Sequence, residues 1–163
     1  MSVDVKAVRG RRSLRYESFD ELMADAERLV STPGTQTLGN WSLGQLLAHL
    51  SAAIEMSLGD VPPPRVPWPI RIVGFFVKGR VLRKGPSPGF KLPAEAEPKV
   101  YPTVASAEEG LQRLRTSVAR AKAGRMSARH PILGPLTHEE WGQLHLRHAE
   151  LHLSFAVPGD RVA

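Results

Sequence analysis

The sequence predicts an all-α fold, namely a four-helix bundle with a long crossover connection between its second and third helices. Four segments place apolar residues at helical spacing, and each follows a Ser/Thr-x-x-Glu/Gln pattern. This pattern is a capping box, whose side chains satisfy backbone groups at the start of a helix. No segment shows the apolar alternation of a β-strand. At 163 residues, 42% of them apolar, the chain suits one domain covering residues 1–163.

The first two predicted helices follow one another closely. The first capping box, residues 18–21, opens an apolar stripe of about three turns, which Pro33 and the glycine after it end. The second box, residues 42–45, opens a longer stripe that Gly59 ends.

The last two predicted helices lie in the C-terminal third of the chain. The third box, residues 106–109, precedes a narrower stripe that Gly124 closes. Acidic residues at its start and basic residues near its end suit the helix dipole. The fourth box, residues 137–140, opens a helix that we expect to run to about Val157, because Pro158 follows.

Residues 59–104 form an irregular, proline-rich connection in this prediction. Prolines exclude a regular helix over residues 61–69, and five more prolines make residues 85–102 extended. Between them, residues 70–82 are apolar and basic and are expected to form a short extra helix. So long a link between the second and third helices permits a crossover.

Composition excludes several classes of function. The chain has no cysteine, which rules out disulfides, thiolate metal sites and a cysteine nucleophile. No window approaches 18 uninterrupted apolar residues, and the basic N-terminus lacks the apolar core of a secretory signal, so we expect a cytoplasmic protein with no membrane partner. The net charge of +6 is scattered and accompanies no nucleic-acid-binding motif, so a nucleic-acid partner is not expected.

Histidines are the residues that could carry chemistry. Five of the six lie between His130 and His152. His148 and His152 are four residues apart, so both imidazoles lie on the inward face of the fourth helix and can close on one metal. His49 lies on the inner face of the second helix and can supply a third ligand. Three protein ligands would hold a divalent metal and leave a position open for water or a small anion.

Alternatives remain open at this point. His145 could replace His148 as a ligand or contact the ligands from outside, and each histidine could instead be an ordinary core or surface residue. His130 and His138 are interpreted as structural. Glu55 and Glu150 are near the ligands in sequence, but helical geometry points both away from the ligand faces. No general base is therefore apparent.

Two stretches give the chain a family resemblance. The first is Gly39-Asn40-Trp41-Ser42-Leu43-Gly44-Gln45, which leads to His49-Leu50; the second covers residues 130–137, Glu140-Trp141 and residues 147–155. Together they resemble the DinB-like superfamily, in a branch classed only as a domain of unknown function. The resemblance implies a four-helix bundle in which His49, His148 and His152 bind a divalent metal, often zinc or nickel. It also implies a homodimer, and better-understood relatives are transferases and isomerases that use low-molecular-weight thiols.

The function that these observations favour is a metal-dependent (thiol) transferase or hydrolase, because three ligands leave a position open. The alternative is a non-catalytic metal-binding or stress-associated bundle with a structural metal. We further hypothesise that residues 70–82, with Trp68, Phe75 and Phe76, line the mouth of the metal pocket. The alternative role for this segment is a dimer contact.

Overall fold

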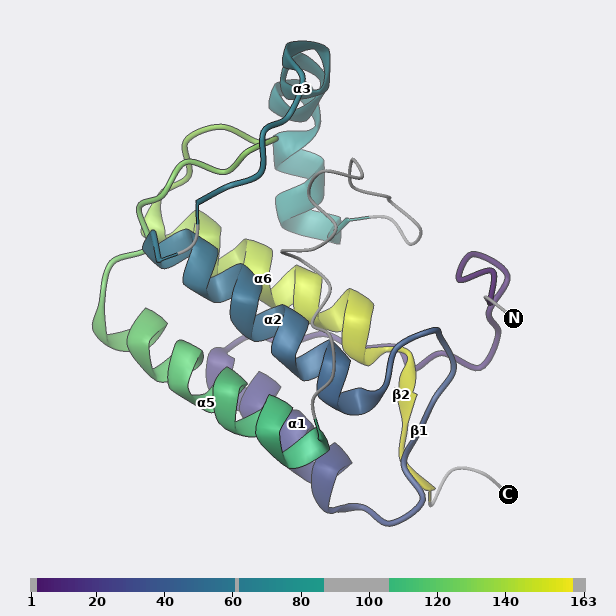
Figure 1. Cartoon of the computed structure of the whole chain (residues 1–163). Coiled ribbons are helices and arrows are strands. Elements are labelled where there is room, and N and C mark those ends of the chain that lie inside the picture. Colours follow the sequence, from purple (N-terminus) through teal and green to yellow (C-terminus); the bar gives the residue numbers. More distant parts are fainter. Residues whose placement is uncertain (1–2, 61, 87–105, 160–163) are drawn as a thin grey trace.

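A computed structural model describes residues 3–60, 62–86 and 106–159 of the chain and is mostly helical (Figure 1). This confirms the all-α prediction. The helices and strands are α1 (Phe19–Ser31), β1 (Gln36–Thr37), α2 (Leu43–Leu58), α3 (Trp68–Lys84), α5 (Ala107–Ala123), α6 (His138–Leu153) and β2 (Ala156–Val157).

Side-chain caps start α1, α2, α5 and α6 at the predicted residues. In each case the hydroxyl accepts a hydrogen bond from the backbone N–H three residues later, at 3.1–3.2 Å. The caps are Ser18, Ser42, Ser106 and Thr137. In α2 and α6 the N–H of the cap residue also donates to the side chain of Gln45 or Glu140, which completes the box. Local sequence thus determines where these four helices begin.

These four helices pack against one another in a ring, in the order α1, α5, α2, α6 (Figure 1). Each contributes fully buried side chains to the core, among them Leu29, Leu114, Leu47 and Trp141. Helices α2 and α5 are parallel neighbours, since Gly110 near the start of α5 lies against Gly44 near the start of α2. A Cβ on Gly110 would come within 2.5 Å of the Gly44 carbonyl oxygen, so only glycine permits this approach.

The end of α6 differs from the prediction. The helix stops at Leu153, not near Val157, and Ala156–Val157 pair with Gln36–Thr37 as a two-stranded antiparallel sheet. The N–H of Leu38 donates to the Phe155 carbonyl at 2.9 Å, which extends this pairing. Strands of two residues are too short to show an alternating pattern, so they could not be predicted from the sequence.

The N-terminal segment ties the C-terminal half of α6 to α1. Arg12 is buried and donates to both carboxylate oxygens of Asp25, at 2.8 and 2.7 Å, and to the Leu153 carbonyl at 3.0 Å. The Tyr16 hydroxyl donates to Asp25 at 2.6 Å, and the Tyr16 carbonyl accepts from Arg147. This network fixes the part of α6 that carries His148 and His152.

The predicted extra helix is present and longer than expected, as α3. It packs on α6 and on the loop before it: Lys78 donates to Glu140 at 2.9 Å, and a Cβ on Gly74 would lie 2.3 Å from the Ile132 carbonyl oxygen. Residues 62–67 are not helical, as predicted. The prediction is wrong for Trp68 and Pro69, which form the start of α3, because proline is tolerated in the first turn of a helix. Most of the predicted extended connection, from residue 87 on, lies outside the described residues. Within the described ranges, no helix is long and apolar enough to cross a bilayer.

Candidate metal centre

Three histidines from two helices meet beside the start of α2. His49 comes from the second turn of α2, and His148 and His152 come from the last turns of α6. The Nε2 atom of His148 lies 3.2 Å from that of His49 and 2.9 Å from that of His152. One potential ligand atom from each residue lies within 4.8 Å of the others. The structure thus brings together the three histidines singled out from the sequence.

The spacing of these nitrogens suits a shared cation. Imidazole nitrogens about 2.0–2.1 Å from a tetrahedral zinc ion are about 3.3–3.4 Å apart. The separation of 3.2 Å is close to this value, and that of 2.9 Å is slightly short. A ring nitrogen makes one strong in-plane interaction, yet Nε2 of His148 faces two others. A divalent ion would interact with all three nitrogens at once, so the donor set fits one.

The surroundings keep the imidazoles of His148 and His152 uncharged, which is the form that can bind a metal. His49 is buried, and His148 and His152 are partly buried. Burial, with the neighbouring His152 and His49, holds the pKa of His148 well below its usual range. Burial, with His49 and Arg11, does the same to the pKa of His152. Both imidazoles are therefore neutral near pH 7, as ligation requires.

Trp41 forms one wall of the site. Its ring stacks on His152, with centroids 5.6 Å apart and planes inclined by 3°, and meets the edge of His49 at 4.9 Å. Trp41 was not predicted to be a site residue. An aromatic residue just before an N-cap usually indicates a hydrophobic staple. Here the same position restrains two of the candidate ligands.

Arg11 contributes a positive charge that acts on His152. It donates to Ser154 Oγ at 3.0 and 2.8 Å, and its guanidinium lies 4.1 Å above the Phe155 ring. The pKa of Arg11 is lowered by burial, and its charge contributes to the low pKa of His152. No local sequence signal identified Arg11, because its approach depends on how the N-terminal segment crosses α6.

The other histidines do not join the cluster. His145 Nε2 lies 2.9 Å from Ser57 Oγ, and its ring stacks on Trp141 at 5.3 Å. The structure therefore places His145 outside the cluster, with Ser57 and Trp141 as its neighbours. Nδ1 of His130 accepts from the N–H groups of Ile132 and Leu133 at 3.1 and 2.9 Å. Nδ1 of His138 accepts from a backbone N–H at 3.2 Å, so both have structural partners.

Carboxylates are absent from this cluster among the described residues. Glu150 accepts from the Tyr16 N–H at 2.7 Å and lies 3.1 Å from Arg147 Nη1. Glu55 accepts from Ser51 Oγ at 3.2 Å. Both carboxylates thus have partners outside the cluster, so proton transfer among the described residues of the site would use a histidine, water or substrate.

The structure does not place α3 at the mouth of the metal pocket, where we expected it. Trp68, Phe75 and Phe76 line a hollow together with residues of the loop 129–135, and none of the three clustered histidines lines that hollow. The described residues of α3 thus surround a second feature, apart from the metal centre.

Comparison with known proteins identifies a family for which no activity is described. The profile of the family described as "Protein of unknown function (DUF1569)" matches residues 8–159, a range that includes the three clustered histidines, Trp41 and Arg11. No curated protein and no solved structure matches the chain at a significant level.

Proposed function

The chain belongs to this family of unknown function, and we propose that it is a metal-dependent protein whose divalent ion is held by His49, His148 and His152. The observation that carries the proposal is the convergence of three Nε2 atoms from two helices, with neighbours 2.9 and 3.2 Å apart. A cluster of neutral imidazoles with no thiolate suits zinc, nickel and similar ions.

The number of candidate ligands supports a catalytic role for the ion. Three protein ligands leave a coordination position for an exchangeable group, as in catalytic sites, whereas structural sites are closed by four. An ion held there would lower the pKa of a thiol or water and supply a nucleophile near neutral pH. We therefore favour a transferase or hydrolase that uses a low-molecular-weight thiol or water. The alternative is a non-catalytic bundle with a structural metal.

The charge beside the site supports an anionic ligand at the open position. Arg11 is held by Ser154 and Phe155, and its charge acts on His152. A thiolate or small anion bound to the metal would be attracted by this guanidinium. Trp41 would exclude water from the side of His152 on which it stacks.

Further parts of the proposal rest on the family resemblance. They are a DinB-like arrangement of the four helices α1, α2, α5 and α6, zinc or nickel as the metal, and a homodimer. A cytoplasmic location is also proposed, from the lack of a spanning segment or a secretory signal in the sequence. The ring order of the helices and their parallel α2–α5 pair are compatible with a bundle that contains a crossover.

Cobalt substitution tests the open position. Protein loaded with Co²⁺ should change its visible absorption when a low-molecular-weight thiol is added, because the thiolate enters the metal's coordination shell. Arg11→Gln should weaken the thiol affinity and retain the metal. Arg9→Gln is the matched control, since Arg9 is exposed and its replacement removes the same charge. A spectrum that no thiol or anion alters would refute the open site and favour the structural alternative.

A further inference from the structure

Helix α3 exposes an unusual amount of apolar surface. Trp68, Phe75 and Phe76 are 70%, 71% and 80% exposed, and Ile72 and Val73 are at least half exposed. These residues occupy the first half of the helix, which stands away from α1, α2, α5 and α6, whereas the end of α3 lies near α6 (Figure 1). Contiguous apolar surface of this kind marks an interaction site.

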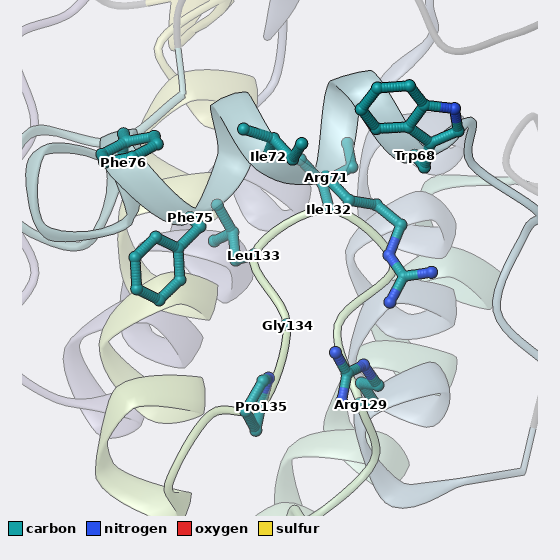
Figure 2. Close-up of a pocket in the computed structure, with 10 residues that line it drawn as sticks. All are labelled: Trp68, Arg71, Ile72, Phe75, Phe76, Arg129, Ile132, Leu133, Gly134 and Pro135. Atoms are coloured by element: carbon teal, nitrogen blue, oxygen red, sulfur yellow. The ribbon is translucent and has the colours of Figure 1, made fainter.

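All charged residues in and around α3, over residues 62–86, are positive. Residues 62–86 contain six cations and no acidic residue: Arg65, Arg71, Lys78, Arg80, Arg83 and Lys84. Among the described residues, only Lys78 of these six forms an ion pair. Arg71 and Arg129 point toward each other across a hollow of about 430 Å³ lined by Trp68, Ile72 and Phe75 (Figure 2). The apolar half of α3 is thus bordered by cations.

We propose that α3 binds the surface of an anionic lipid bilayer. Its first half enters the boundary between headgroups and acyl chains, and the cations of its second half, with Arg71 and Arg129, bind acidic headgroups. Peripheral proteins combine apolar and aromatic insertion with basic residues in this way. The expectation of no membrane partner rested on the lack of a spanning segment, which a helix lying in the interface does not need.

Other occupants explain less of this surface. A small ligand in the hollow would cover Trp68 and Phe75 but would leave Val73, which does not line the hollow, exposed. A second copy of the chain would bring two helices together whose charged residues are all positive, and these charges repel each other. Single-stranded nucleic acid stacks on aromatic rings but gains little from exposed isoleucine and valine. A bilayer accommodates both the apolar half and the cations.

Vesicle binding can be followed through Trp68. Of the three tryptophans, Trp141 is buried and Trp41 is partly buried, so a blue shift of the emission on binding reports mainly on Trp68. Full-length protein should bind vesicles of phosphatidylglycerol mixed with phosphatidylcholine, and should bind less as salt is raised. Vesicles of phosphatidylcholine alone should bind at least ~10-fold more weakly. Trp68→Phe should remove most of the emission shift and keep co-sedimentation.

Two double variants separate the apolar and basic contributions. Phe75→Ser/Phe76→Ser and Arg71→Gln/Arg80→Gln alter exposed side chains, so both should fold, which circular dichroism checks. Each should weaken vesicle binding by roughly 10-fold or more. The control is Arg113→Gln/Arg115→Gln, which removes the same charge from the exposed face of α5 and should change binding by less than about 2-fold.

Several results would overturn the proposal. Equal binding to neutral vesicles would remove the role of the cations, and unchanged binding of Phe75→Ser/Phe76→Ser would remove the role of insertion. Self-association that this variant abolishes, seen by sedimentation velocity, would assign α3 to a second copy. Binding of an uncharged apolar ligand or of a single-stranded oligonucleotide to α3, together with no vesicle binding at physiological salt, would assign the surface to that ligand.

Discussion

Replacing Arg12 with methionine should destabilise the protein strongly. Arg12 is 7% exposed and donates three hydrogen bonds, two to Asp25 and one to the Leu153 carbonyl. Asp25 also accepts from Tyr16 and Arg28, at 2.6 and 2.9 Å. The variant keeps these two donors but leaves a largely buried carboxylate without its main partner.

The pKa of Asp25 helps to estimate how much stability Arg12→Met loses. Burial alone would raise this pKa, but the bonds from Arg12, Tyr16 and Arg28 outweigh it and lower the pKa from 3.8 to about 2. The shift corresponds to about 2 kcal/mol of stability, which is present above pH 4 and lost as the pH falls through about 2. Removing one partner of a buried pair costs about 3–5 kcal/mol. Because two donors remain, we expect a loss of about 3 kcal/mol for Arg12→Met at pH 7.

Urea unfolding of the metal-free protein measures this loss. Arg28→Met is the matched control, since it removes a more exposed partner of the same carboxylate and should cost less than about 1 kcal/mol. The difference between wild type and Arg12→Met should shrink as the pH is lowered toward 2, where Asp25 becomes protonated in both proteins. Replacing both partners, as Arg12→Met/Asp25→Leu, should recover much of the loss. An Arg12→Met variant no less stable than Arg28→Met would refute this account of the N-terminal segment.

Three further outcomes follow from the structure. Gly110→Ala should lower the free energy of unfolding by more than about 2 kcal/mol, because its Cβ would collide with the backbone of Gly44; Gly142→Ala, which meets open space, should be neutral or stabilising in the same urea assay. Burial lowers the pKa of His145 to about 3 and that of His130 to about 4, so NMR should show neither ring titrating between about pH 8 and 5.5. The unfolded chain does take up these protons, so stability should fall as the pH drops below about 6.5; titration of either ring near 6.5 would contradict its burial. A chelator should lower the melting temperature of zinc-loaded protein by roughly 5–10 °C at pH 7.5, since a free ion at a hundredfold its Kd stabilises the fold by about 2.7 kcal/mol. The decrease should be smaller at pH 5.5, where protonation competes with the metal for the imidazoles. Equal melting curves with and without chelator would argue against ligation.

The helices and the three histidines were predictable because their signals are local. A capping box fixes the start of a helix within four residues, and the spacing of His148 and His152 puts both on one face. His49 followed from the inward face of α2. Such arguments require only one helix at a time.

Features that depend on contacts between distant segments were missed. The early end of α6 results from pairing with residues 36–38, and no periodicity in either strand reveals it. Arg11 reaches Ser154 across the fold, and Trp41 stacks on His152 because α2 starts beside the end of α6. The sequence could not show which of His145 and His148 joins the cluster, because the partner of His145 is Ser57, a residue of another helix.

Metal content tests the central claim most directly. Protein purified without a histidine tag, loaded with Zn²⁺ and desalted, should contain about one ion per chain by elemental analysis. His148→Gln should lose the ion, because Nε2 of His148 faces both other ligands. His145→Gln, a change of a buried imidazole on the same helix that still offers a donor to Ser57, should keep it. Zinc retained by His148→Gln, or lost by a folded His145→Gln, would contradict the assignment of His49, His148 and His152 as the metal centre.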